Sequence, residues 1–414
     1  MNSSAPHAEP VVVTGLGAFT AAGAGTSVLW ESVLQGISPA RWYEATKPGG
    51  PRLPVCVAPD PKSDDPRLRR LRRSDRIVQL AGAAACEAWD DAGLQKSGPP
   101  PERIAIFAGT SRGPVGSILH SAAGYAAEER LSPTIALNTT VACLSGALSL
   151  LFAVRGPCLT ISAACASGGA AIAMAAQQVS AGLVDVALAG GAEAPFHDFV
   201  LAQLQNARVL AHHSEPHLAC RPFDAARSGT VLGEGAAFLV LESLSSARRR
   251  GARIHAQLGG WAVGAEGNER TGISAHNQSL HQQITHALAM ASVPEIAHLY
   301  VNAHATGTDL GDRMEAEVIN RISARNRNNV TSSTKAVTGH CMGAAAAIEA
   351  VISVLALERQ CLPPSANCFE QANDCALTLV RERPTSCRVD AVLSNSAGFW
   401  GNNAALVFTP SPTN

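Results

Sequence analysis

Charged side chains are scarce in this chain. Aspartate, glutamate, lysine and arginine make up 16% of its 414 residues, whereas about 25% is usual for a globular protein. Because the formal net charge is only −1, no overall field attracts nucleic acid or a membrane surface, and neither is expected as a partner. Together with a hydrophobic share of 46%, the low charge indicates extensive buried surface, within the chain or between subunits.

Paired cysteine motifs and long apolar runs are also missing. The eleven cysteines include no C-x-x-C pair, so we expect free thiols rather than disulfides or a metal site. The longest apolar stretches, near residues 148–154 and 344–357, are too short for a membrane span or are interrupted by Glu349. Residues 1–9 lack the pattern of a signal peptide. These absences predict a soluble, cytoplasmic protein.

Strand-like and helix-like segments alternate along the whole chain. Apolar and β-branched runs predict strands at residues 10–17, 104–109, 159–161, 184–190, 236–241, 254–262, 298–303, 330–333, 376–380, 390–395 and 404–408. Helical spacing or propensity predicts helices within residues 74–92, 113–129, 138–154, 170–177, 277–291, 312–322 and 343–358. Ser74 or Asp75 is expected to cap the first of these helices. The alternation predicts an α/β protein with two layers of mainly parallel sheet. We expect two halves, residues 1–255 and 256–414.

Cys165 lies where the predicted strand at 159–161 breaks into an alanine-rich helix. Free backbone N–H groups and the positive end of the helix dipole gather at such a point, and they favour the nucleophilic thiolate. Small neighbours, from Ala164 to Gly169, leave room for a substrate to approach the sulfur. A lone cysteine of this kind is more often a small core residue.

Two histidines overturn the interpretation of Cys165 as a core residue. His304 follows an apolar strand and precedes a loop with hydroxyl and glycine residues, and His340 lies between Gly339 and an alanine-rich helix. Each histidine alone is more often structural. One candidate nucleophile and two such histidines in one α/β chain indicate an active site.

The segments around these residues resemble the β-ketoacyl-(acyl carrier protein) synthases of the elongating, Cys-His-His type, which have a thiolase-like fold. The resemblance spans about residues 10–409 and rests on residues 164–168, 304–308 with 311–315, and 335–340, supported by 189–193, 221–224, 233–235 and 395–403. Plain thiolases use a second cysteine near the end, and initiating synthases replace one histidine with asparagine. Non-catalytic chain-length partners lack the cysteine that stands here at 165.

The resemblance implies a fold of five layers, αβαβα, and a decarboxylative Claisen condensation. Cys165 would take an acyl chain from the phosphopantetheine of an acyl carrier protein, and malonyl-carrier protein would supply the attacking enolate. No further cofactor is implied: the initial Gly15-Leu16-Gly17 lacks the third glycine of a dinucleotide-binding loop. The family pairs two subunits through the strand before the nucleophile, so we expect a homodimer or a heterodimer with a related subunit.

The resemblance also implies a role for each site residue. His304 and His340 would stabilise the enolate, and the backbone N–H groups of Cys165 and Phe399 would form the oxyanion hole. Phe399 corresponds to the family's gate. Three further sets complete the expected site: Lys335 and Glu315 as a buried ion pair, Thr306 and Thr308 as hydroxyls for the pantetheine arm, and Arg112 and Trp400 as substrate-binding residues.

Several positions depart from the pattern of fatty-acid enzymes. Ala397 replaces a phenylalanine, Trp400 a glycine and Asn402 a threonine in the C-terminal motif. Arg112 falls where those enzymes carry an aliphatic residue in the acyl pocket, and an unpaired guanidinium beside an alkyl chain is costly. These changes predict a specialised polyketide or polyene pathway. The alternatives are housekeeping fatty-acid elongation and a mainly structural subunit of a ketosynthase heterodimer.

Two arginine clusters stand out. One spans residues 67–76 and the other residues 248–253. Such clusters are usually solvated faces, and the sharper interpretation is a docking patch for an acidic partner. We expect Arg69, Arg72 and Arg73 to bind the carrier protein.

Overall fold

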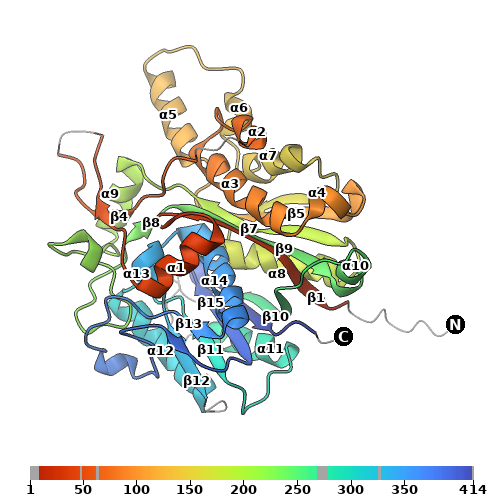
Figure 1. Cartoon of the computed structure of the whole chain (residues 1–414). Helices are drawn as coiled ribbons and strands as arrows, with labels where there is room; N and C mark the ends of the chain where they lie inside the picture. The colour runs from red at the N-terminus through yellow and green to blue at the C-terminus, as the bar shows by residue number, and fades with distance from the viewer. Residues whose placement is uncertain (1–8, 47–48, 62–64, 268–277, 325–327, 413–414) are drawn as a thin grey trace.

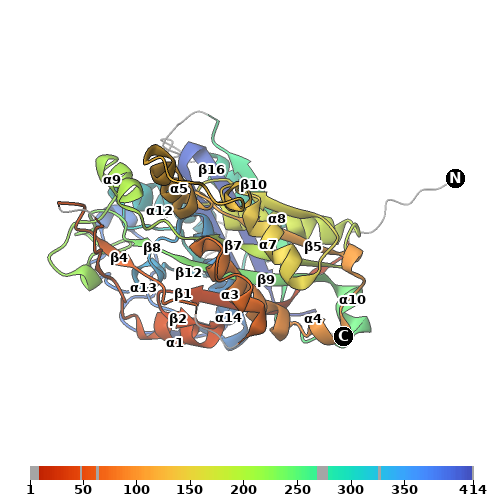
Figure 2. The same ribbon diagram turned by 90° about the horizontal axis from the view of Figure 1, so that it is seen from above.

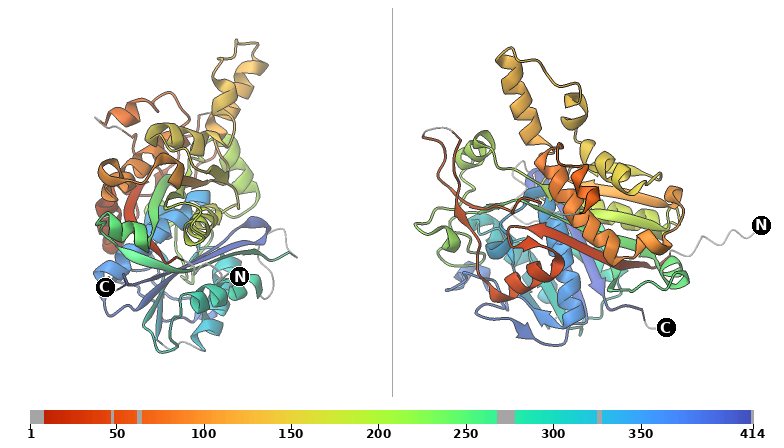
Figure 3. Two further views of the ribbon diagram at one scale, coloured as in Figure 1. Left: turned by 90° about the vertical axis from the view of Figure 1, so that its right-hand side faces the viewer. Right: turned by 45° about the horizontal axis from the view of Figure 1, so that its top comes forward.

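The computed structural model describes residues 9–46, 49–61, 65–267, 278–324 and 328–412. Within them, helices and strands form five layers, in which two β-sheets enclose a central pair of helices and further helices cover both outer faces (Figures 1 and 3). The predicted α/β class with mainly parallel sheets is confirmed. Residues 1–8, most of the segment in which the sequence shows no signal-peptide pattern, lie outside the described residues, as does residue 277, the predicted start of a helix.

The two sheets have the same strand pattern. The first has the order β6-β5-β7-β9-β1, and the second has the order β12-β11-β15-β16-β10. The two sheets are joined into one continuous sheet at their edges, where β1 pairs antiparallel with β10. In each sheet the first three strands are parallel and the fourth is antiparallel to its neighbours. The strands are β1 (Val11–Thr20), β5 (Ile104–Gly109), β6 (Cys158–Ile161), β7 (Val186–Glu193), β9 (Gly235–Ser243), β10 (Ala256–Ala265), β11 (Leu299–Asn302), β12 (Asn329–Ser332), β15 (Ala391–Ala397) and β16 (Asn402–Thr409). The division into halves at residue 255 stays a prediction.

The central layer consists of α8 (Ser167–Ser180) and α14 (Ala345–Arg359), which contact each other and both sheets. Their small side chains let helix and sheet backbones approach closely, which explains the alanine-rich sequences. Residues 345–357 of α14 are all buried, including Glu349. α1 (Thr26–Gln35) lies beside α14 (Figure 2). Because both central helices begin at the same edge of the sheets, their N-termini bring the Cys165 and His340 segments together.

The outer helices are α3 (Arg76–Asp91) and α7 (Cys143–Phe152) on the first sheet, and α11 (Gln278–Met290) and α12 (Asp309–Ser323) on the second half. Asp75 caps α3 by accepting a hydrogen bond from the backbone N–H of Ile77, as predicted for a cap at 74 or 75. Trp89 of α3 stacks on Phe152 of α7 with ring centroids 4.4 Å apart. This contact joins the two helices over the sheet.

Two segments differ from the prediction. The helix expected over 138–154 is interrupted, with α6 (Ile135–Asn138) before α7, because the hydroxyls of Thr139 and Thr140 bond the backbone carbonyls of Ile135 and Leu137. The strand expected at 376–380 is a loop that touches β12 only at one bridge, between Thr331 and Leu379.

The remaining elements are short or peripheral. They are β2 (Gly23–Ala24), β3 (Arg41–Trp42), β4 (Pro54–Cys56), α2 (Pro66–Arg69), α4 (Leu94–Ser97), α5 (Val115–Ala126), α9 (Asp198–Asn206), β8 (Leu232–Gly233), α10 (Leu244–Arg249), α13 (Lys335–Thr338), β13 (Cys361–Leu362) and β14 (Thr385–Ser386). Together α5 and α6 form an arm that projects from the body (Figures 1 and 3). None of the helices in the described part of the chain has the length and apolar character needed to cross a bilayer.

Candidate active site

Cys165 is presented by a sharp turn between β6 and α8. Ala164 has φ of 50°, in the left-handed region, and the hydroxyl of Ser167 holds this turn by accepting from the N–H of Ala163 and donating to the carbonyl of Ala164. The helix begins at Ser167, so Cys165 lies two residues before it. The sulfur is thereby placed at the end of the central helix, within reach of loops from the second half.

The segment after β15 closes over this turn. A Cβ atom at Gly398 would lie 2.9 Å from the backbone nitrogen of Cys165, so only glycine fits there. The backbone N–H of the next residue, Phe399, lies close enough to the Cys165 thiol to lower its pKa. This position suits the oxyanion-hole role predicted for Phe399, because a carbonyl attached to Cys165 would lie beside the same N–H.

Both predicted histidines lie at the Cys165 sulfur. The Nε2 atom of His340 is 3.1 Å from Sγ, and the rings of His304 and His340 meet edge to face with centroids 5.3 Å apart. His340 is fixed by its backbone, because its N–H donates to the carbonyl of Val231 and its carbonyl accepts from Gly233. The sequence therefore identified three side chains that the fold brings together.

The environment of these three groups favours their neutral forms. Burial raises the pKa of the Cys165 thiol to about 12, although Lys335 and the Phe399 backbone N–H oppose the rise. Burial and the Lys335 cation lower the pKa of His340 to about 3 and hold that of His304 well below its usual range. The resting site is a thiol beside a neutral imidazole. These pKa shifts oppose the helix-stabilised thiolate expected from the sequence, because desolvation outweighs the stabilising groups.

Lys335 pairs with a different acid from the one predicted. Its Nζ atom contacts Glu349 of α14 in a fully buried ion pair, not Glu315. Glu315 instead accepts hydrogen bonds from the backbone N–H groups of His304 and Ala305, at 2.7 and 2.6 Å, and from Asn395 at 2.7 Å. Glu315 thus holds the His304 loop, whereas Glu349 holds Lys335.

The sequence did not identify two buried acids, Glu349 and Glu193, as site residues. Glu349 was visible only as a charge that interrupts an apolar run. Glu193 accepts from the backbone N–H groups of Ser111, Arg112 and Gly343, at 2.7, 3.0 and 2.9 Å, and so joins the segment at 111–112 to the segment that follows His340. Burial raises the pKa of both carboxyl groups to about 7, against these hydrogen bonds.

The three catalytic candidates open into a cavity of about 720 Å³. The predicted substrate residues Thr306, Thr308, Arg112 and Trp400 all line it, and the Thr306 and Thr308 hydroxyls are 3.1 Å apart. Its other lining residues are Ser111, Ser162, Ala163, Ala164, Leu204, Arg208, Val209, Thr230, Leu232, Leu280, Ala305, Asp309, Leu310, Gly311, Glu315, Met342, Ala397, Gly398, Phe399 and Asn402. Of the described residues, Cys165, His304 and His340 form the group whose donor atoms, all within 4.8 Å of one another, could ligate a metal ion.

Trp400 adopts a conformation that suits the glycine found in fatty-acid enzymes. Its φ is 64°, in the left-handed region that disfavours bulky side chains, and its side chain is 66% exposed at the cavity rim. The exchange therefore places an indole on the rim at the cost of backbone strain.

The first arginine cluster divides into two kinds of residue. Arg67 pairs with Asp65 and Asp90, and Arg76 pairs with Asp60 and Glu234, so these two hold local structure. Arg69, Arg72 and Arg73 are exposed beside them. In the second cluster, Arg250 binds the buried Glu242 and Arg253 contacts Glu358. The three arginines predicted to bind the carrier protein are therefore all exposed on the surface.

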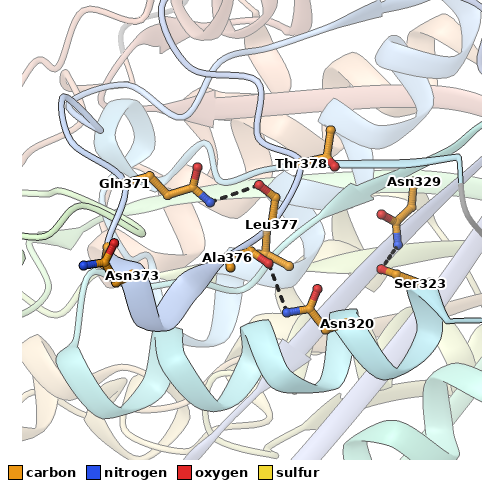
Figure 4. Close-up of a pocket in the computed structure, with 9 residues that line it drawn as sticks. Asn320, Ser323, Asn329, Gln371, Asn373, Ala376, Leu377 and Thr378 are labelled. Atoms are coloured by element: carbon orange, nitrogen blue, oxygen red, sulfur yellow. Dashed lines mark hydrogen bonds between the residues drawn. The ribbon is translucent and has the colours of Figure 1, made fainter.

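A second cavity, of about 630 Å³, lies between α12 and the loop at 371–378 (Figure 4). Its amide side chains serve the loop: Asn320 donates to the carbonyl of Ala376, and Gln371 donates to the carbonyls of Cys375 and Leu377. These bonds use carbonyls that a strand would offer to a neighbour, which explains the missing strand at 376–380. No thiol, imidazole or ion pair lines this cavity within the described residues, so the chemistry belongs to the first one.

Comparisons with known proteins agree along the whole chain. Residues 8–247 match the family model described as beta-ketoacyl synthase, N-terminal domain, and residues 255–369 match its C-terminal domain. A putative polyketide beta-ketoacyl synthase 1 from Streptomyces cyaneus is 34% identical, over 96% of this chain and 97% of its own. A 3-oxoacyl-[acyl-carrier-protein] synthase 2 from Coxiella burnetii is 31% identical, over 96% and 98%.

Solved structures show the same similarity. A type II PKS ketosynthase, bound to its acyl-carrier protein and a hexaketide, superposes with a TM-score of 0.89 at 25% identity, covering 98% of this chain and 100% of that one. The ishigamide ketosynthase/chain length factor superposes with a TM-score of 0.87 at 31% identity, with the same coverage.

Proposed function

The chain belongs to the β-ketoacyl synthase family, and we propose that it elongates carrier-bound acyl chains in a specialised polyketide or polyene pathway. As a member of this family it is an acyltransferase that forms carbon–carbon bonds. The observation that carries the proposed chemistry is the 3.1 Å contact between His340 and the Cys165 sulfur, with His304 beside them in one cavity.

In the first half-reaction the Cys165 sulfur attacks the thioester carbonyl of an acyl-carrier protein. The neutral His340 is placed to accept the thiol proton, so no preformed thiolate is needed. The tetrahedral oxyanion receives hydrogen bonds from the backbone N–H groups of Cys165 and Phe399. Collapse of this intermediate expels the carrier's pantetheine thiol, which takes up the proton, and leaves the acyl group on Cys165.

In the second half-reaction malonyl-carrier protein enters with its arm along Thr306 and Thr308. Loss of carbon dioxide leaves its electron pair on the thioester as an enolate, and imidazole N–H groups of His304 and His340 stabilise the enolate oxygen. Both rings are neutral, so each can present one N–H. The enolate carbon then attacks the acyl-Cys165 thioester, which forms the new carbon–carbon bond and frees the thiolate to regain a proton.

Removing either histidine should separate the two half-reactions. We expect His304→Ala or His340→Ala to slow malonyl decarboxylation by about 10²- to 10³-fold, the usual cost of one oxyanion donor, while some acylation of Cys165 persists. Release of carbon dioxide and intact-protein mass report the two steps. His286→Ala, on the outer helix α11, is the matched control. Decarboxylation at the wild-type rate in both site variants would contradict the enolate role.

The pathway proposal rests on the cavity departures at Arg112, Ala397 and Trp400. We expect short, unsaturated or aryl-capped acyl groups to acylate Cys165 faster than long saturated chains, measured by competition between carrier-bound acyl groups and intact-protein mass. Arg112→Ile combined with Trp400→Gly should shift the preference toward saturated chains, because it removes a cation and a bulky rim residue. A preference for long saturated chains in the unmodified protein would instead favour fatty-acid elongation.

The carrier protein is proposed to dock on Arg69, Arg72 and Arg73. A patch of positive charge raises the association rate of an acidic partner, and salt weakens this effect by screening the charges. Replacing all three with glutamate should raise the KM for carrier-bound substrates by about tenfold at low salt, and by less at high salt. A variant with Arg248→Glu, Arg249→Glu and Arg383→Glu makes the same change in net charge elsewhere on the surface and is the control. An unchanged KM at low salt would return the patch to a plain solvated surface.

A second subunit is proposed to pair with β6. This strand ends its sheet, and Leu159 on it is 53% exposed, so an unpaired edge and an apolar side chain lie together. The similarity to a ketosynthase/chain length factor supports a heterodimer, and self-pairing through β6 would give a homodimer. A condensation assay with this subunit alone distinguishes an active enzyme from a mainly structural partner.

A further inference from the structure

Arg112 is a cation on the wall of the Cys165 cavity without an acidic partner in the described ranges. Its Nη1 atom donates to the side-chain oxygen of Gln203 at 3.0 Å, and the guanidinium forms no ion pair there. No hydrogen bond from the other two guanidinium nitrogens is found in the described part of the chain, and Arg112 is one of the residues that line the cavity. A guanidinium fork prefers paired oxygen acceptors such as a carboxylate.

The position of Arg112 is fixed at both ends. Its backbone N–H donates to the buried Glu193 at 3.0 Å, and the following N–H, of Gly113, donates to the Thr110 hydroxyl at 3.0 Å. At the other end, Gln203 lies on α9, one position before the cavity residue Leu204. The Arg112 backbone is thus held by the Glu193 carboxylate, and its guanidinium is hydrogen-bonded to α9 through Gln203.

The carboxylates that line the same cavity are committed elsewhere. Asp309 pairs with Arg227 at 3.0 Å, and Glu315 is occupied by the His304 loop and Asn395. The wall near Arg112 otherwise includes the apolar Leu204 and Met342. A saturated chain on this wall would take water away from the guanidinium and return no hydrogen bond.

We propose that Arg112, oriented by Gln203, binds an oxygen atom carried by the acyl chain on Cys165. The substrate class is therefore an oxygenated acyl chain, with either a keto group or a carboxylate beyond the thioester. Arg112 is the specificity-determining residue, and Gln203 is a positioning residue. The assignment rests on the proposed acyl transfer to Cys165 and names the chemistry of the chain that the cavity accepts.

The experiment compares carrier-bound acyl groups of matched length, over several lengths: saturated, keto-substituted and ending in a carboxylate. We expect an oxygenated group to acylate Cys165 about 10- to 100-fold faster than the saturated one, the value of a hydrogen bond to a charged group. Arg112→Leu should bring this ratio close to one, and Gln203→Ala should lower it partly. Arg388→Leu, which removes a surface arginine paired with Asp390, should keep the wild-type ratio.

The keto-substituted and carboxylate-ending acyl groups show which oxygen group Arg112 binds. Faster transfer of only the keto group identifies a carbonyl, and faster transfer of only the carboxylate identifies an anion. Faster saturated chains in the wild type, or an unchanged ratio in Arg112→Leu, would overturn the proposal. Binding of the corresponding non-reactive pantetheine amides is measured in parallel. If no chain acylates Cys165 but the amides show a preference that depends on Arg112, the proposed acyl transfer is wrong and the proposed binding site is supported. If no chain acylates Cys165 and all amides bind equally, both proposals are wrong.

Discussion

Replacing Cys165 with alanine is expected to reduce condensation by at least about 10⁴-fold, because the covalent acyl intermediate cannot form. The two histidines remain in place, so malonyl-carrier protein should still lose carbon dioxide on the variant. Release of carbon dioxide by the variant therefore shows that the protein is folded and binds the pantetheine arm of malonyl-carrier protein. Product formation is followed by mass spectrometry of the carrier-bound β-keto chain. Condensation within about tenfold of the wild-type rate would remove Cys165 from the mechanism.

Cys165→Ser should also abolish or nearly abolish acyl transfer, since the serine hydroxyl is a much weaker nucleophile without a dedicated base.

The pH dependence of thiol alkylation in the wild type tests whether Cys165 is a thiol or a thiolate before substrate binds. With the thiol pKa raised to about 12 by burial, the thiolate fraction increases tenfold per pH unit throughout the neutral range. Alkylation by iodoacetamide should therefore keep rising up to pH 9. A plateau beginning below pH 7 would indicate a preformed thiolate–imidazolium pair instead.

Hydrophobic patterning predicted most of the helices and strands, because these elements depend mainly on residues that are close together in the sequence. The strand at 104–109 coincides with β5, and α3 begins directly after the predicted cap, Asp75. The failures occurred where side chains compete for backbone groups. Thr139 and Thr140 interrupt a helix by bonding carbonyls, and Asn320 and Gln371 hold a loop where β-propensity indicated a strand. Such competition depends on contacts that residue spacing does not reveal.

The site shows the same division. Residues at the ends of strands and the starts of helices, such as Cys165 and His304, could be predicted because glycine-rich and small-residue motifs mark those turns. The partner of Lys335 could not, since Glu315 and Glu349 both lie on helices and only packing decides which of them reaches the ammonium group. The desolvation of the Cys165 thiol could not be predicted either, because local sequence indicates a helix terminus but not the depth of burial.

Lys335→Met should be among the most destabilising substitutions in the chain, because it leaves the Glu349 carboxylate buried without a counter-ion. Loss of one partner of a buried pair costs about 3–5 kcal/mol of unfolding free energy. Replacing both members, Lys335→Met with Glu349→Leu, should recover most of this loss, since packed apolar groups remove the buried charge. Lys335→Met with Glu315→Leu should not recover it, because Glu315 serves the backbone of His304 and Ala305. Urea unfolding of the four proteins gives the comparison.

The pH dependence of the Lys335→Met variant gives an independent test of the Lys335–Glu349 pairing. Burial already raises the pKa of Glu349 to about 7, and removing the lysine raises it further. An acid whose folded-state pKa exceeds its unfolded value destabilises the protein increasingly as pH rises from the unfolded to the folded pKa. The stability deficit of Lys335→Met relative to the wild type should therefore grow only above about pH 7, where the wild-type carboxyl group ionises beside Lys335 and the variant carboxyl group must ionise without it, by up to about 1.4 kcal/mol per pH unit, and the variant that also carries Glu349→Leu should lack this slope. Equal recovery by Glu315→Leu, or a deficit independent of pH, would show that Glu349 is not the partner on which Lys335 depends.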